Sequence, residues 1–398
     1  MQRREFLGTA AGGLATAAAA PAGGGVLATP EQAATRKKLR VGIVGCGRMG
    51  QYFAEVYRRL PDTELAAIAE YNDERRKVVG ERFGVKALYK DVHAMLREQV
   101  PDIVAIITPT KFMKDAVIAS AEAGVKGVST DKPIAASLVD ADAMVEACRR
   151  RNIVYAGGNL QRARWQIQEA GRRLRSGEYG KITGAAVLGF GGEISGGGCQ
   201  HVSVLRLFTG AEVAEVMAWG HPPEALARDD DGGLIINGRF RMTNGIECLV
   251  FGDRDKTSDG VQIWSDSHIV RWNWDSPRIS QSGVGGRKEV AANYPPFLWK
   301  HVLAKPPLRD TDDYLVSSIR SFVDAVHGSK NTLFVSGHDL RQALEVAIAS
   351  KLSAQLGNQP VKLPLKDRTL ALLPSPYRWV GGDAAGRPQT AAEAAGER

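Results

Sequence analysis

Three glycines with GxGxxG spacing form the pattern that points most directly to chemistry. They lie in the run Gly45-Cys46-Gly47-Arg48-Met49-Gly50. A β-rich stretch, residues 39–44, precedes this run, and a helical apolar pattern, residues 51–60, follows it. In this setting the first glycine permits a tight turn, the second lets the backbone approach a pyrophosphate, and the third lets helix and strand pack closely. The N–H groups at the helix start then bind phosphate, so the run predicts a dinucleotide cradle; the alternative is a glycine-rich turn that binds no nucleotide.

An acidic residue stands where such a cradle needs one. Glu70 follows a second β-rich stretch, residues 65–69, and lies 20 positions after Gly50. A carboxylate there accepts hydrogen bonds from both ribose hydroxyls of the adenosine half and repels a 2′-phosphate. The next residues are Tyr71 and Asn72 rather than arginine. The sequence therefore favours NAD over NADP.

These residues need a parallel sheet to position them, and the chain alternates strand and helix patterns through its first half. We expect folded sequence to start at Leu39. Helices are predicted at 73–83, 114–123 and 138–150, and strands at 102–107, 125–129 and 153–156. The loops at 108–110, 130–133 and 157–162 then lie at the carboxyl edge of the sheet, where ligands bind in such folds. The fold class is α/β, with an N-terminal Rossmann domain over residues 39–160.

The second half has strands without regular intervening helices. β patterns are found at 182–190, 213–219, 234–242, 245–251, 261–266 and 268–274, followed by helices near 312–327 and 337–356. We predict an α+β domain over residues 161–367 with a mostly antiparallel open sheet. The Ala/Gly-rich stretch 384–398 is predicted to be disordered.

Several of these motifs together resemble the glucose-fructose oxidoreductase/inositol dehydrogenase/MocA family. They are the GxGxxG opening, Thr108-Pro109, Asp131-Lys132-Pro133 and the segment Gly157-Gly158-Asn159-Leu160-Gln161-Arg162. The resemblance covers residues 39 to about 365 and is stronger before residue 162 than after it. It implies that Thr108, Pro109, Asp131, Lys132 and Arg162 contact the cofactor.

The resemblance also implies a role for Lys132. In the family, a Glu-Lys-Pro motif places its lysine beside the nicotinamide ring and the reacting sugar hydroxyl; here Asp131 replaces the glutamate and keeps its charge. A lysine in a partly buried site can polarise the hydroxyl oxygen, and its pKa falls readily on desolvation. The alternative is that Lys132 only neutralises Asp131.

The chain departs from the family at the histidine that commonly serves as general acid or base. Alignment on Arg206 and Gly210 puts Gln200 at that histidine and Ser203 at the aspartate that accompanies it; His201 is displaced by one residue, or about 100° around a helix. Three interpretations stay open. His201 enters the site through a local shift, or Lys132 acts alone while Gln200 binds substrate, or the chemistry is not simple dehydrogenation. A purely structural role for His201 also stays open.

Composition excludes several other classes of function. The net charge is +8, but the basic residues are scattered without a recognition motif, so no nucleic-acid partner is expected. Four cysteines and seven histidines show no metal-ligand spacing, and we expect no metal.

The N-terminus carries the pattern of an export signal. Arg3-Arg4 and Phe6-Leu7 precede an apolar stretch at 9–20, which resembles a twin-arginine signal. We therefore assign residues 1–34 to a signal and leader, with cleavage between Ala20 and Ala34, and expect the twin-arginine machinery as a partner and a periplasmic or otherwise exported location. The alternative is a disordered Ala-rich leader.

Three functions are consistent with these patterns. The first is oxidation of a sugar or polyol hydroxyl by a tightly bound NAD, with Lys132 at the hydroxyl. The second is glycoside cleavage by oxidation, elimination and reduction with the same cofactor, and the third is a non-catalytic carbohydrate-binding protein that retains a dinucleotide. We expect a homo-oligomer, because the open sheet of the family often serves that purpose.

Overall fold

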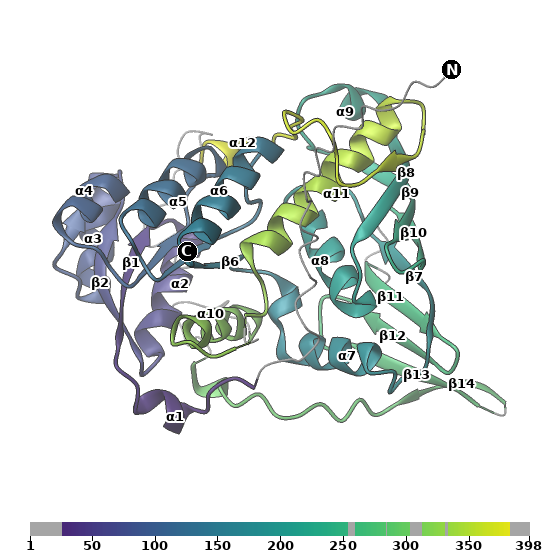
Figure 1. Ribbon diagram of the computed structural model, residues 1–398, viewed down its shortest axis with the longest axis horizontal. Helices are drawn as coiled ribbons and strands as arrows, with labels where there is room; N and C mark the ends of the chain where they lie inside the picture. The colour runs from purple at the N-terminus through teal and green to yellow at the C-terminus, as the bar shows by residue number, and fades with distance from the viewer. Residues whose placement is uncertain (1–25, 254–258, 284, 303–312, 331–332, 383–398) are drawn as a thin grey trace, which may run out of the picture.

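The computed structural model describes residues 26–253, 259–283, 285–302, 313–330 and 333–382. They form two domains, each built on one sheet, that lie side by side (Figure 1). In these residues no helix is long and apolar enough to cross a membrane. The tail predicted at 384–398 lies outside the described residues.

The first domain has the predicted Rossmann architecture. Its six strands are all parallel, in the order β3-β2-β1-β4-β5-β6. They span β1 Leu39–Val44, β2 Thr63–Ala69, β3 Leu88–Tyr89, β4 Ile103–Ile106, β5 Gly127–Thr130 and β6 Val154–Ala156. The crossover helices are α2 Arg48–Arg59, α3 Asp73–Phe83, α4 Val92–Glu98, α5 Met113–Glu122 and α6 Leu138–Arg150. The pattern analysis did not identify β3 and α4, because two strand residues and two helical turns show little periodicity.

Burial explains why the alternation of patterns predicted this sheet. All four residues of β4 are buried, as expected for a central parallel strand with helices on both faces. One of those faces is covered by a helix from much later in the chain, α10 Asp313–Val326, which packs on α2 and β6. Gly127 makes this approach possible, since a Cβ there would lie 2.7 Å from the Phe322 ring. Thus α10, in the range predicted for the second domain, completes the core of the first.

Folded structure begins before Leu39, where we had expected it to start. Leu27 and Ala33 are buried, and the short helix α1 Pro30–Ala34 carries a capping box between Thr29 and Gln32. Residues 27–34, predicted to be leader, therefore belong to the folded part. The segment was missed because five helical residues are too few to show an apolar period.

The second domain is built on a mixed, mostly antiparallel sheet of nine strands, ordered β14-β13-β12-β11-β7-β10-β9-β8-β15. Only β7 and β10 pair in parallel. The strands are β7 Ile182–Leu188, β8 Val213–His221, β9 Ile235–Met242, β10 Glu247–Phe251, β11 Gly260–Ser265, β12 His268–Trp272, β13 Arg278–Gly283, β14 Gly286–Val290 and β15 Val361–Lys362. The remaining helices are α7 Trp165–Arg175, α8 Gly198–Thr209, α9 Pro223–Ala227, α11 Gly337–Gln355 and α12 Pro376–Trp379. The sheet predicted from the strand patterns is confirmed.

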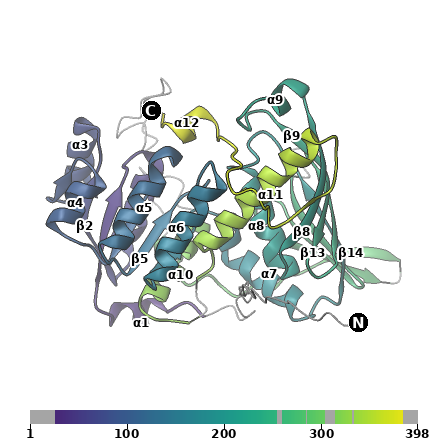
Figure 2. The same ribbon diagram turned by 45° about the horizontal axis from the view of Figure 1, so that its top comes forward.

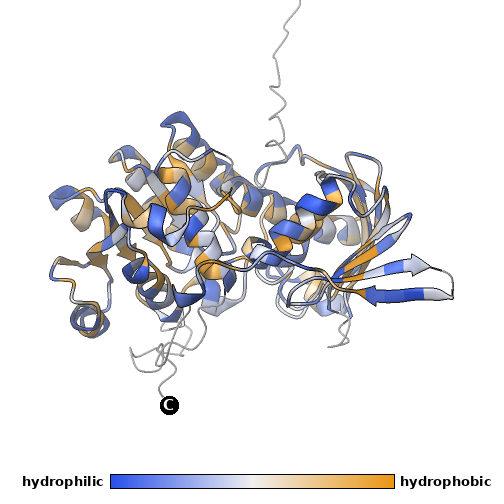
Figure 3. Cartoon of the chain, turned by 90° about the horizontal axis from the view of Figure 1, so that it is seen from below, coloured by the Kyte–Doolittle hydropathy of each residue, from blue (hydrophilic) through white to orange (hydrophobic). Residues whose placement is uncertain are grey.

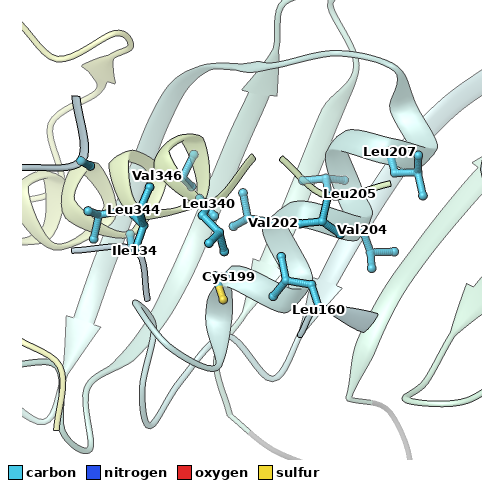
Figure 4. Close-up of a cluster of buried hydrophobic side chains, with 14 of the residues drawn as sticks. Ile134, Leu160, Cys199, Val202, Val204, Leu205, Leu207, Leu340, Leu344 and Val346 are labelled. Atoms are coloured by element: carbon cyan, nitrogen blue, oxygen red, sulfur yellow. The ribbon is translucent and has the colours of Figure 1, made fainter. Parts of the chain in front are cut away.

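Helices α8 and α11 pack on one face of this sheet, and the polar β13–β14 hairpin projects beyond it (Figure 3). An apolar cluster between the two helices joins the domains (Figure 4). It combines Cys199 and Val202 of α8, Leu340 of α11, Leu160 from the loop after β6, and Ile134 from the loop after β5. Since Ile134 lies two residues after Lys132, this cluster holds the lysine loop against α8.

Candidate active site

The turn after β1 has the geometry of a phosphate cradle. Gly45 has φ +85°, and a Cβ there would lie 2.5 Å from the carbonyl oxygen of Ile107. A Cβ on Gly50 would lie 2.0 Å from the Gly45 carbonyl oxygen, so the helix can approach the turn only with glycine at that position. Gly47 caps α2, which leaves the N–H groups of its first turn available to a phosphate. Arg48 and Met49, predicted to bind the cofactor, form that first turn, so the helix begins three residues before the predicted Gln51.

Glu70 lies beside this turn, buried at the end of β2. Its Oε2 accepts a hydrogen bond from the Cys46 N–H at 2.7 Å, and its Oε1 accepts one from the Asn72 N–H at 3.0 Å. The sequence analysis missed one neighbour: Nη2 of Arg75, in the first turn of α3, lies 3.2 Å from Oε1. Arg75 therefore offsets part of the negative charge that would repel a 2′-phosphate. Its only sequence signal is an arginine five residues after the acid.

Among the buried polar atoms that lack a hydrogen-bond partner within the described residues, three follow consecutive parallel strands. They are Thr108 Oγ1 after β4, Asp131 Oδ1 after β5 and Asn159 Oδ1 after β6. Buried polar atoms are rarely left unpaired, because burial removes the water that would otherwise pair with them. A dinucleotide at this edge of the sheet can supply the missing partners with its ribose and carboxamide groups. These residues therefore fit the predicted cofactor, and Pro109 lies in the same edge loop as Thr108.

Lys132 is half-buried and follows Asp131 directly. Among the described residues its ammonium makes neither a hydrogen bond nor an ion pair, so neutralisation of Asp131 through a direct pair is not observed. Its charge acts on Cys199, whose thiol donates to the Gly196 carbonyl at 2.8 Å. Burial raises the pKa of this thiol to about 12, against the opposing charge of Lys132, so Cys199 is a neutral thiol. Lys132 is therefore a cation at this edge whose donors are uncommitted among the described residues.

Gln200 and His201 face different surroundings. Gln200 Oε1 accepts from the Gln161 N–H at 2.7 Å, and its Nε2 donates to the Asn159 carbonyl at 3.4 Å, so this side chain ties α8 to the loop after β6. His201 Nε2 instead pairs with Asp259 Oδ1 at 2.7 Å.

The His201 ring packs against Trp272 and Trp274, with centroid distances of 5.7 and 5.6 Å. The histidine is thus on the side of α8 that meets the second sheet. Acid–base roles for Gln200 and His201 stay predictions.

Arg162, predicted to contact the cofactor, binds to Phe334 and Asp339. Its Nε donates to the Phe334 carbonyl at 3.1 Å, and its Nη1 lies 2.9 Å from Asp339 Oδ1. Despite burial of Asp339, the charges of Arg162 and Arg206 hold the pKa of its carboxyl below the usual range. These contacts give Arg162 a structural role between the loop after β6 and α11, and its contact with the cofactor stays a prediction.

Two further charged residues at this site were not identified from the sequence. Glu193, in the glycine-rich run before α8, pairs with Arg378 of α12. They are 185 positions apart, so no local pattern could have joined them. In the described residues, no group of three or more His, Cys, Asp or Glu side chains is placed to hold a metal ion.

Comparisons with known proteins agree with the fold and with a dinucleotide-binding first domain. A family model described as an oxidoreductase family with an NAD-binding Rossmann fold matches residues 39–158. The chain is 25% identical to D-apiose dehydrogenase of Paraburkholderia graminis over 347 residues, covering 81% of this chain and 89% of that protein. It is 29% identical to myo-inositol 2-dehydrogenase of Thermotoga maritima over 262 residues, covering 63% and 74% of the two chains.

The fold also matches a solved structure of an oxidoreductase from Agrobacterium radiobacter in complex with NAD+, L-tartaric acid and magnesium. The TM-score is 0.68 at 21% identity, covering 82% of this chain and 98% of that chain. Fold and site together define an NAD(P)-dependent oxidoreductase. Residues 39–158 match the model of that oxidoreductase family, and the similarity to named dehydrogenases continues into the second domain.

Proposed function

We propose that this protein oxidises a secondary hydroxyl of a sugar or polyol and passes the hydride to a tightly held NAD. The observation that carries the proposal is the position of Lys132. Lys132 is half-buried, follows β5 and Asp131 directly, and makes no hydrogen bond or ion pair with the described residues. Relatives that span both domains, named for apiose and myo-inositol, support a polyhydroxylated substrate.

The chemistry divides between the cofactor and the chain. The nicotinamide, when bound, accepts the hydride that leaves the carbinol carbon. The Lys132 ammonium donates to the substrate oxygen and relays the hydroxyl proton to solvent as the C–O bond becomes a carbonyl. It passes one of its own protons to water and takes the hydroxyl proton in exchange. Asp131 contributes a buried acceptor for the nicotinamide ribose, while Thr108 and Asn159 offer polar atoms on either side. Gln200 keeps the loop after β6 in place through its two backbone contacts.

The proposed preference for NAD rests on Glu70, because its carboxylate lies where a 2′-phosphate would need space and positive charge. Arg75 weakens this preference without reversing it, since it pairs with that same carboxylate. Export by the twin-arginine route, to the periplasm or beyond, rests on the sequence pattern of residues 3–20. A resident cofactor suits a location where free NAD is scarce.

The first experiment uses purified protein with no nicotinamide added. Its near-ultraviolet absorbance is recorded before and after a panel of sugars, polyols and glycosides, and bound nucleotide is identified by mass spectrometry. A reduced-nicotinamide band with one sugar supports the proposal. Glycoside cleavage without net cofactor change would favour the oxidation–elimination–reduction route, and NAD-loaded protein inert towards the whole panel would favour a binding role.

Replacement of Lys132 tests its assignment to the reacting hydroxyl. We expect Lys132→Met to lower the rate of nicotinamide reduction by about 10²- to 10⁴-fold, with bound NAD unchanged. Lys126→Met is the matched control, because Lys126 lies before β5, half-exposed and ion-paired with Asp102. Equal rates in the two variants would exclude Lys132 from the reaction.

A further inference from the structure

The segment after residue 367, where we had ended the second domain, crosses between the two domains. The Leu138 N–H donates to the Leu370 carbonyl at 3.1 Å, and the Leu372 N–H donates to the Ala136 carbonyl at 2.8 Å. One residue further, the Asp231 N–H donates to the Leu373 carbonyl at 3.1 Å. The segment is therefore anchored both to the chain that follows Lys132-Pro133 and to the second domain. Figure 2 shows α12 above the junction between the domains.

Beyond these anchors, α12 reaches the cofactor edge of the first sheet. It packs on the short helical turn Thr110–Phe112 that follows β4. A Cβ on Gly381 would lie 2.9 Å from Pro109 Cγ, which shows how closely the segment approaches the loop after β4. Arg48 of the phosphate turn is close enough for its charge to act on the Tyr377 phenol, whose pKa burial raises to about 12. The segment thus extends over the predicted cofactor site.

Arg378 is the cation that α12 brings to this site. Its Nε donates to Glu193 Oε2 at 2.9 Å, and its guanidinium stacks on the Tyr377 ring at 4.8 Å from the centroid. A Cβ on Gly196 would lie 3.0 Å from the same Nε, so the side chain lies against the bare backbone of the glycine-rich run. Its side chain is 21% exposed. Nη1 and Nη2 make no hydrogen bond to any described residue.

Arg378 lies at the Lys132 end of the cofactor edge. Lys132 and Arg378 are the two cations whose charge acts on the Cys199 thiol, and the carboxylate of Asp131 acts on Arg378. With Glu193, these four side chains carry two positive and two negative charges, which sum to zero. An anionic substrate group would meet two carboxylates there, whereas a neutral ligand that both donates and accepts hydrogen bonds suits every one of these side chains.

We infer that Arg378 and Glu193 bind two neighbouring hydroxyl groups of an uncharged polyol, with Arg378 donating to one hydroxyl and Glu193 accepting from the other. This pair then decides which carbon of the substrate lies at Lys132. The inference rests on the proposed function, since it names how that site selects its substrate. A hydroxyl group has one O–H donor and two acceptor lone pairs. Of two neighbouring hydroxyls, one can therefore donate to the carboxylate while the other accepts from the guanidinium.

The test compares the substrate that reduces the resident nicotinamide with its set of mono-deoxy analogues, in wild-type protein and in Arg378→Met. Wild-type protein should discriminate by about 10- to 100-fold in kcat/KM against the analogue that lacks a recognised hydroxyl. In Arg378→Met, kcat/KM for the parent substrate should fall by a similar factor and the discrimination should largely disappear. Bound NAD, measured by mass spectrometry, should be unchanged.

Two further variants sharpen the result. Arg378→Lys keeps the charge but loses the planar fork, and we expect it to recover part of the activity without the discrimination. Arg149→Met is the matched control, since Arg149 makes the same kind of Nε–carboxylate pair, at 2.6 Å to Glu146, on the exposed face of α6.

The outcomes separate this inference from the function on which it rests. Activity on a sugar with unaltered discrimination in both Arg378 variants would overturn the inference and leave the proposed function standing. The inference would also be overturned if both variants lost their bound NAD and lost activity equally on all analogues. Arg378 would then act on cofactor binding or on the fold, and the proposed function would still stand. Wild-type protein inert towards every sugar and polyol would overturn both.

Discussion

The side chain of Asp231 is a buried carboxyl group that contacts the glycine-rich run next to Glu193. Its Oδ2 accepts from both the N–H and the hydroxyl of Ser195, at 2.7 and 2.6 Å, and Ser195 lies two residues after Glu193. Burial raises the Asp231 pKa to about 6, although the Ser195 hydrogen bonds oppose the rise. Asp231 thus holds the glycine-rich run in place while its negative form is disfavoured.

The pH dependence of stability follows from that shift. Because the folded-state pKa lies above the unfolded value, the native state keeps this proton longer, and the contribution to stability is present below about pH 4 and lost as the pH rises through 6. The loss is about 2–3 kcal/mol of unfolding free energy. Asp231→Asn keeps an acceptor for Ser195 and removes the titration. We therefore expect this variant to match wild type in thermal unfolding at pH 4 and to be more stable at pH 8; an equal difference at both pH values would contradict the assignment.

At the scale of elements, the N-terminal arm Leu27–Ala34 is joined to the first domain by residues far along the chain. The indole N–H of Trp299 donates to the Ala28 carbonyl at 3.0 Å, and the Ala28 N–H donates to Asp324 Oδ2 at 3.0 Å. Asp324 also pairs with Arg320, whose guanidinium forks onto Asp62 at 2.7 and 2.8 Å. Removal of the arm would therefore leave buried polar groups without partners. It would also expose the apolar surface that Leu27 covers.

Two truncations test the arm. A chain starting at residue 26 should unfold like the full chain, whereas a chain starting at residue 36 should lose about 3 kcal/mol or more of unfolding free energy in denaturant titration. Equal midpoints for the two truncations would show that the arm adds nothing. If the leader is cleaved, the contacts of Leu27 and Ala28 favour a cleavage site before residue 27, in the N-terminal part of the predicted 20–34 window.

At the scale of the whole molecule, we expect the homo-oligomer to form through the face of the nine-stranded sheet that α8 and α11 do not cover. Trp219 of β8, and Leu249 and Phe251 of β10, are each close to half exposed, at 49%, 47% and 48%. Registers across β9 bring Met217, Arg239 and Leu249 into one row. This face exposes large apolar side chains on both sides of Arg239 and Arg241 of β9, and a second copy of the chain is the occupant we propose.

The proposed interface can be tested by light scattering on gel-filtered protein. The wild-type chain should be a dimer or larger, and the pair of changes Trp219→Asp and Leu249→Asp should yield monomer that still holds NAD. Val139→Asp is the control, because Val139 is 51% exposed on α6, away from this sheet. A monomeric wild-type protein, or an unchanged double variant, would rule out this face as an interface.

Local features of the sequence were sufficient to predict the first domain and one side of the site. A side chain at Gly45 or Gly50 would clash with nearby backbone, and Glu70 follows its strand directly. Each of these features can therefore be recognised from a few consecutive residues. Lys132 could be placed for the same reason, since it follows a buried strand of a parallel sheet. The strands of the second domain were predicted from their alternation, and their order was not.

Only the tertiary structure brings together the residues of the candidate site that are far apart in the sequence. Arg378 reaches Glu193 across 185 residues, Trp299 reaches Ala28 across 271, and α10 completes a core begun by α2. His201 and Gln200 are neighbours in sequence, yet one faces a sheet and the other a loop. Such contacts depend on how the domains pack, and packing energy is shared by residues with no common period or spacing. The sequence by itself therefore determined the glycine turn and the position of Lys132 after β5, whereas only the folded chain brought Arg378 and Glu193 together.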